Sequence, residues 1–134
     1  MSRSGYIYEY DDPRQVAMWR GAVASAIRGK RGQAFLKEML DAMDHLPEPK
    51  LIKNELVTGD GVCAIGAVAV KRSIDIKDVD PEDRETIASI FKIAPALAAE
   101  IVYMNDEYYF GPSPSETPEM RFRRMRAWIQ DQIK

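Results

Sequence analysis

The residues best suited to chemistry are the only histidine and the only cysteine of this 134-residue chain, His45 and Cys63. A histidine titrates near neutral pH and a thiolate is favoured near a helix N-terminus, so the two could form a base and a nucleophile. However, no third, orienting residue is indicated. His45 ends an expected helix, where a polar ring suits the helix dipole. Cys63 lies in an apolar run, where cysteine usually packs as a small hydrophobe. The sequence therefore predicts no catalytic residue and no enzyme activity.

The sequence also argues against metals and cofactors. One cysteine and one histidine exclude the multi-cysteine and two-histidine ligand sets typical of zinc sites. Gly29-Lys30-Arg31-Gly32 is basic but lacks the spacing of a phosphate-binding loop. The acidic residues crowded into 75–83 lack the spacing of a calcium loop. We expect no metal ion and no cofactor.

A basic cluster is the first candidate binding site. Six basic residues and no acidic residue lie between Arg14 and Lys37, and a compact cluster of this kind can contact phosphates. The formal net charge of −2 opposes binding to nucleic acid, although a local patch can outweigh it. The candidate nucleic-acid-binding residues, expected at one end of the first two helices, are Arg20, Arg28, Lys30 and Arg31.

Two segments that combine tyrosines with acidic residues form the second candidate site. Tyrosine provides a large contact area with few rotatable bonds, which suits protein interfaces. The alternative is that these side chains fold back over apolar edges of the core, and the sequence does not decide between the two. The candidate protein-binding residues are Tyr6, Tyr8, Tyr10, Asp11, Asp12, Asp106, Glu107, Tyr108 and Tyr109.

The elements that must position these candidates are helices with clear start and stop signals. An Asp-Pro-x-Gln capping signature predicts a helix over 12–29. Apolar residues at helical spacing predict a second helix over 33–46, which two prolines then end. A turn of two to four residues around Lys30-Arg31-Gly32 would make this pair antiparallel.

Three further helices follow the same logic. They are expected to start at Asp80-Pro81, at Ala94-Pro95 and at Thr117-Pro118, and Asn105 is expected to close the second of them in a left-handed conformation. Residues 51–70 fit either a hairpin or a buried helix, and their alanine content favours the helix. The last helix carries arginines all round its circumference, which are expected to be solvated. These are Arg121, Arg123, Arg124 and Arg126.

The predicted fold is all-α: one compact domain over residues 1–134, a bundle of about five or six short helices. A small hairpin at residues 51–70 is the α+β alternative, and residues 1–10 are expected to form an acidic-aromatic arm. No apolar run approaches the ~20 residues of a membrane span and no signal-peptide core is present, which predicts a cytoplasmic protein. The expected core residues are Val16, Trp19, Val23, Ile27, Phe35, Leu36, Met39, Leu40, Met43, Cys63, Ile65, Val68, Ile87, Ile90, Phe91, Leu97, Ile101, Phe122, Met125 and Ile129.

Several runs together resemble a family of small uncharacterised proteins encoded by tailed bacteriophages and prophages. The resemblance covers nearly the whole chain and implies expression inside a bacterium during infection or lysogeny, but it implies no activity, cofactor or catalytic residue. Lys92 departs from it, because relatives tend to place glycine there. The runs are Trp19-Arg20-Gly21-Ala22-Val23, Ile27-Arg28-Gly29-Lys30-Arg31-Gly32-Gln33-Ala34-Phe35-Leu36, Gly61-Val62-Cys63-Ala64-Ile65-Gly66-Ala67-Val68, Ile93-Ala94-Pro95-Ala96-Leu97-Ala98-Ala99-Glu100-Ile101, Asn105-Asp106-Glu107 and Glu116-Thr117-Pro118-Glu119.

Together these features favour a non-enzymatic phage accessory protein that binds and inhibits or modulates a bacterial macromolecule. A defence complex or a nucleic-acid-processing complex is the expected type of target, which would make the protein an anti-defence inhibitor. The expected partner is a bacterial host protein or ribonucleoprotein complex in the host cytoplasm, with no membrane involved. The alternative is a nucleic-acid-binding regulatory protein that uses the basic patch where the first two helices meet.

Overall fold

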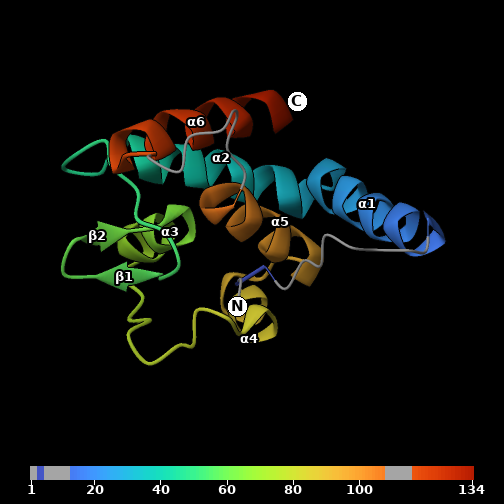
Figure 1. Ribbon diagram of the computed structural model, residues 1–134, viewed down its shortest axis with the longest axis horizontal. Coiled ribbons are helices and arrows are strands. Elements are labelled where there is room, and N and C mark those ends of the chain that lie inside the picture. Colours follow the sequence, from blue (N-terminus) through green and yellow to red (C-terminus); the bar gives the residue numbers. More distant parts are fainter. Residues whose placement is uncertain (1–2, 5–12, 108–115) are drawn as a thin grey trace.

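The computed structural model describes residues 3–4, 13–107 and 116–134 (Figure 1). Within these ranges it confirms the all-α prediction, with one short hairpin. No single helix in the described ranges is long and apolar enough to cross a bilayer. The elements are α1 (Pro13–Arg28), α2 (Lys30–Asp44), β1 (Val57–Thr58), β2 (Gly61–Val62), α3 (Ala64–Arg72), α4 (Arg84–Phe91), α5 (Pro95–Asp106) and α6 (Pro118–Gln132).

Helix α2 is the centre of the arrangement. It packs against α1, α3 and α6, while α5 packs against α1, α3, α4 and α6. Figure 1 shows α6 along one side of α2, with the hairpin and α3 at one end of the molecule. At the other end α1 extends beyond the body formed by the remaining helices.

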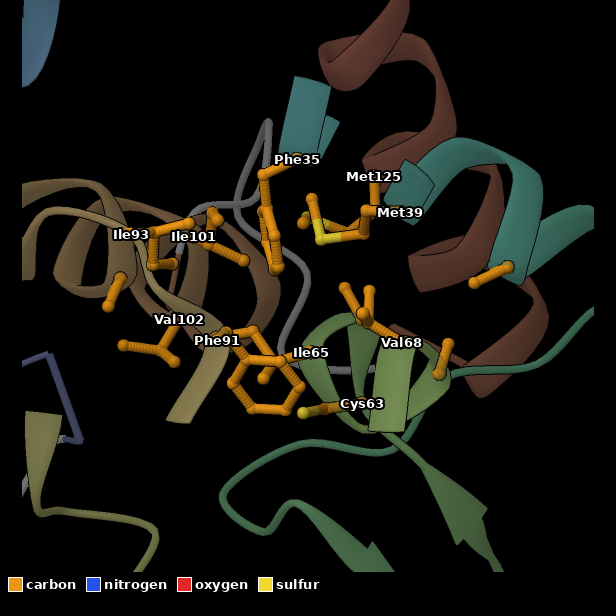
Figure 2. Packing of buried hydrophobic residues seen from close by; sticks show 14 of the residues in the cluster. Phe35, Met39, Cys63, Ile65, Val68, Phe91, Ile93, Ile101, Val102 and Met125 are labelled. Carbon is orange, nitrogen blue, oxygen red and sulfur yellow. The ribbon is translucent and has the colours of Figure 1, made fainter. Parts of the chain in front are cut away.

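The core forms where α2, α3, α5 and α6 meet, and α4 closes it through Phe91 (Figure 2). The rings of Phe35 and Phe91 meet edge to face, with their centroids 6.0 Å apart, a geometry that aromatic pairs favour. Most of the expected core residues are buried. The exceptions, which are only half-buried, are Val16, Trp19, Leu40 and Ile90.

The prediction of an antiparallel α1–α2 pair is wrong. Only Gly29 separates the two helices, with an extended backbone at φ −66° and ψ 158°. One residue is too short a link to reverse the chain, so α2 continues away from α1 (Figure 1). Gly32 permits this junction, because a Cβ there would lie 1.8 Å from the carbonyl oxygen of Ala26.

The sequence left open whether residues 51–70 form a hairpin or a buried helix, and the structure contains both. Val57 pairs with Val62 and Thr58 with Gly61 in an antiparallel hairpin, and α3 begins two residues after it, at Ala64. Gly66 lets the chain before the hairpin lie against α3, because a Cβ there would meet the carbonyl oxygen of Leu56 at 2.1 Å. The apolar run therefore folds as a buried helix capped by a small hairpin.

Two helix boundaries differ from those expected. Helix α4 is capped by Asp83, whose side chain accepts a hydrogen bond from the Thr86 amide, whereas Asp80 caps only the turn before it by accepting from the Glu82 amide. Helix α5 continues through Asn105 to Asp106 instead of ending at a left-handed asparagine. Its last turn needs no such residue, because an arginine of α6 donates to the carbonyl groups there.

Lys92 ends α4 in the left-handed conformation, with φ 58° and ψ 44°. The tight turn between α4 and α5 therefore forms around a lysine and not a glycine. A side chain with a Cβ is disfavoured in this conformation, whereas glycine adopts it without penalty.

Replacing Lys92 with glycine should therefore raise the free energy of unfolding by about 1 kcal/mol. Chemical denaturation of the wild type and of Lys92→Gly measures the change. The matched control is Lys71→Gly, within helix α3, which should lower stability by about 1 kcal/mol. A loss of stability in Lys92→Gly as large as that of the control would contradict this assignment.

Candidate functional site

The basic residues expected to bind nucleic acid lie at the corner between α1 and α2. Arg28 ends α1, and Lys30 and Arg31 begin α2. All three are exposed, and none forms an ion pair with a carboxylate in the described part of the chain. Among the described residues, Arg28 donates only to the hydroxyl of Ser25, at 3.4 Å. We call Arg28, Lys30 and Arg31 the basic junction.

Arg20, the fourth candidate, has a different role. Its guanidinium donates to both carboxylate oxygens of Glu100 on α5, at 2.9 and 3.1 Å, and lies 5.2 Å from the centre of the Trp19 ring. The Glu100 side chain is 5% exposed and that of Arg20 is 49% exposed. Arg20 therefore neutralises a buried carboxylate and holds α1 against α5, which removes it from the basic junction.

The arginines of α6 do not extend the basic surface as solvated side chains. Arg121 is buried and donates to the carbonyl oxygen of Leu51 at 2.8 Å. Arg124 forms two hydrogen bonds with Glu116, at 2.6 and 2.9 Å. Arg126 pairs with Asp44 of α2. The expectation of a solvated set is therefore wrong for Arg121 and Arg124, and Arg123 is the exposed member.

These pairs shift the acidity of their carboxylates. Burial opposes ionisation of Glu116, but hydrogen bonding to Arg124 and the positive charges of Arg124 and Arg121 outweigh burial and lower its pKa. The pKa of Asp44 is lowered by its hydrogen bonds with Arg126. Arg121 has a lowered pKa because burial removes its charge from water.

A lowered pKa in the folded state means that ionised Glu116 stabilises the fold above the pKa of an unfolded glutamate, about 4.3. This contribution is lost as pH falls through the pKa of Glu116 in the folded state.

The wild type should therefore have a higher free energy of unfolding than Glu116→Gln at pH 7, and the difference should shrink below about pH 4. Denaturant titrations across this range measure it. Glu82→Gln, at an exposed position, should show little difference at either pH, and a Glu116→Gln difference independent of pH would contradict the assignment.

The acidic-aromatic candidates divide into two groups. Asp106 and Glu107 are described, and both take part in the fold instead of forming an open surface. The Asp106 side chain is 2% exposed, and Glu107 accepts a hydrogen bond from Ser4 at 2.5 Å. The interpretation of Asp106 as a surface contact is therefore wrong. The candidates that lie outside the described residues are Tyr6, Tyr8, Tyr10, Asp11, Asp12, Tyr108 and Tyr109.

The partner of Asp106 is Arg3, which the sequence analysis missed. The side chains of Arg3 and Asp106 are both buried. Two nitrogens of the Arg3 guanidinium donate to the two carboxylate oxygens of Asp106, each at 2.6 Å. Arg3 also donates to the Glu55 carbonyl oxygen and to the sulfur of Cys63. Burial lowers the pKa of Arg3, but attraction to Cys63 and Asp106 outweighs burial and raises it. A single arginine outside any helix carries no periodic signal, so the sequence could not reveal this contact.

Asn105 completes the same polar cluster. Its amide nitrogen donates to the Ile52 carbonyl oxygen at 2.9 Å, and its amide oxygen accepts from the Ala64 backbone at 3.2 Å. Arg84 of α4 donates to the Ser4 carbonyl oxygen at 2.8 Å. The cluster thus joins the ends of α3, α4 and α5 to residues 3–4 and to the chain before the hairpin.

Removing one partner of a buried ion pair leaves the other charge uncompensated, which costs about 3–5 kcal/mol. We expect this loss of unfolding free energy in Arg3→Met and in Asp106→Asn. In the double variant the loss should be clearly smaller than the sum of the two single losses, because neither charge remains. A denaturant-based double-mutant cycle measures the coupling.

The control is Arg126→Met, which breaks the more exposed pair with Asp44 and should cost far less stability than either buried substitution, because solvent screens an exposed ion pair. Equal losses in Arg3→Met and Arg126→Met would show that the buried pair does not hold the fold together as described.

Cys63 and His45 lie in unlike surroundings. Cys63 is 1% exposed, within the core (Figure 2), and its sulfur caps α3 by accepting from the Gly66 amide at 3.4 Å. The His45 side chain is 76% exposed, with Nδ1 2.8 Å from the Asp41 carbonyl oxygen. The structure therefore places each in the role expected of it, as a core residue and as a residue at a helix end.

No cluster of three metal-ligating side chains occurs in residues 3–4, 13–107 and 116–134.

Helices α4 and α5 have the geometry of a helix-turn-helix. The chain bends by 109° between them, within the range typical of that motif. In that motif the second helix, here α5, would have to enter the major groove of DNA. However, Leu97, Ile101 and Val102 bury α5 in the core. The pair therefore cannot read bases in the usual way.

Comparison with known proteins gives no relative: no family model, curated protein or solved structure matches this chain. The resemblance to phage proteins stays a prediction.

Proposed function

We propose that this chain is a non-enzymatic binding protein that contacts nucleic acid through the basic junction. The observation that carries the proposal is that Arg28, Lys30 and Arg31 are exposed and form no ion pair in the described ranges. Several arginines elsewhere in those ranges are held by carboxylates, for example Arg20 and Arg124. Three adjacent cations that the fold does not use are available to an anionic partner.

The surroundings of the basic junction support a phosphate partner. No acidic residue occurs in α1 or in the first turns of α2, so nearby carboxylates on these helices do not offset the charge. Attraction between exposed charges extends over a screening length of about 8 Å at physiological salt. Phosphates that approach this corner are therefore attracted by three positive charges together.

This proposal retains the broader expectation of a phage accessory protein. A protein that occupies nucleic acid, or the nucleic acid of a host ribonucleoprotein complex, would modulate a defence or nucleic-acid-processing system without catalysis. Asp106 and Glu107 do not contribute, because Arg3 and Ser4 bind them. The tyrosine-rich segments remain a proposed route to a host protein.

The test is binding of labelled DNA and RNA oligonucleotides across a salt series, measured by fluorescence anisotropy. Three phosphate contacts predict that log K falls with log salt with a slope of roughly −2.7, at about −0.9 per phosphate on a DNA duplex. The triple variant Arg28→Gln/Lys30→Gln/Arg31→Gln should lose most of the affinity and of the slope.

The control is Lys53→Gln/Lys77→Gln/Arg123→Gln, which removes the same charge from exposed positions elsewhere. It should retain most of the affinity. Absence of binding at low salt, or equal losses in the two triple variants, would refute the proposed function.

A further inference from the structure

The pocket that holds the Arg3 side chain is built by parts of the chain far from residue 3. Its acceptors are the two carboxylate oxygens of Asp106 at the end of α5, the carbonyl oxygen of Glu55 and the sulfur of Cys63. All four contact one guanidinium, and the side chains of Arg3 and Asp106 are each 2% exposed. We call Glu55, Cys63 and Asp106 the arginine pocket.

Contacts that do not involve Arg3 hold this pocket in shape. Oδ1 of Asp106 accepts hydrogen bonds from the backbone amide of Asn54 at 3.1 Å and from the side chain of Asn105 at 2.8 Å. The sulfur of Cys63 is fixed where it caps α3. Because none of these bonds depends on Arg3, the acceptors are arranged in advance for a guanidinium, which lowers the cost of binding one.

The chemistry of the pocket selects a guanidinium over an ammonium group. Nε and Nη2 of Arg3 bond to the two oxygens of Asp106, each at 2.6 Å, and Nη1 bonds to the Glu55 carbonyl oxygen at 3.1 Å. The planar fork of arginine presents donors in this arrangement, whereas lysine is a single point charge. Asp106 is also the last residue of α5, where the helix dipole favours a cation.

The residue after Arg3 adds a second element of recognition. The hydroxyl of Ser4 donates to Glu107 at 2.5 Å, and its carbonyl oxygen accepts from Arg84 of α4 at 2.8 Å. Residues 3–4 lie in no helix or strand. A separate peptide of the same sequence could therefore take their place without breaking a helix or a sheet.

We propose that the arginine pocket, together with Arg84 and Glu107, is a binding site for an Arg-Ser segment of a separate polypeptide. Residues 3–4 occupy this site in the structure. Exchange replaces one buried ion pair by an identical one, so the pairing energy of residue 3 does not oppose a second arginine. What opposes it is the effective concentration of a tethered segment, which is typically of millimolar order. None of these residues belongs to the basic junction, so the two proposals stand or fall separately.

The test uses the full chain with Arg3→Ala, which removes the guanidinium and its stem from the pocket. At about 10 mM, ethylguanidinium or the peptide Ser-Arg-Ser-Gly, the sequence of residues 2–5, should raise the thermal unfolding midpoint of this variant by about 3 °C or more. The effect should saturate, and the peptide should act at the lower concentration because it also supplies the serine contacts. Guanidinium unfolds proteins only at molar concentrations. If Arg3→Ala is unfolded by itself, the same ligands should restore its helical circular dichroism.

The controls isolate the fork and the carboxylate. Ethylammonium and Ser-Lys-Ser-Gly carry the same charges without the fork and should give a clearly smaller shift in Arg3→Ala. The double variant Arg3→Ala/Asp106→Asn should lose the response to both ligands, because the carboxylate is gone. Arg126→Ala, which empties the more exposed pair with Asp44, should not respond, because water screens that carboxylate.

A mixture of Arg3→Ala with Asp106→Asn distinguishes two sources of the arginine. The first variant has a pocket without its arginine, and the second has the arginine without a complete pocket. Association of the two, seen by sedimentation, would support the proposal with a second copy of the chain as the source. Peptide binding without association would support it with a different protein as the source. No shift with either ligand, or an equal shift with ethylammonium, would overturn it.

Discussion

The buried Arg3–Asp106 ion pair joins parts of the protein that lie far apart in the sequence. A buried charge is costly unless it is paired and its remaining donors are satisfied. Arg3 meets this condition only with Asp106, the Glu55 carbonyl group and Cys63 held in place. The end of α5, the chain before the hairpin and the start of α3 are therefore mutually fixed. The position of α5 in turn determines where α1 can pack, because Arg20 pairs with Glu100.

The same requirement to pair buried charge divides the arginines into two groups. Arg3, Arg121 and Arg124 lie in or near the interior and hold segments far apart in the sequence. Arg28 and Arg31 at the α1–α2 corner are exposed and form no ion pair with a carboxylate of the described residues. A functional surface can thus be distinguished from structural charge by what each guanidinium contacts. Net charge and local sequence density do not make this distinction.

The predictions that succeeded rest on local signals. Thr117 caps α6 through its hydroxyl, and Pro95 begins α5, as their sequences indicate. Apolar spacing located Phe35, Met39 and Met125 in the core. The misplaced start of α4 came from a choice between two similar local signals. Asp80 and Asp83 are both able to cap a helix, and α4 begins after the second.

By itself, the sequence determined that this chain forms short amphipathic helices around one apolar core, because capping and periodicity act between residues a few positions apart. It also determined that positive charge concentrates in residues 14–37. The tertiary structure alone decided that Gly29 leaves α1 extending away from α2, and that Arg20 and Asp106 are bound to partners while Arg28, Lys30 and Arg31 are exposed. The reason is that pairing of charges depends on which helices meet, and the contacts that bring them together span as many as 103 residues.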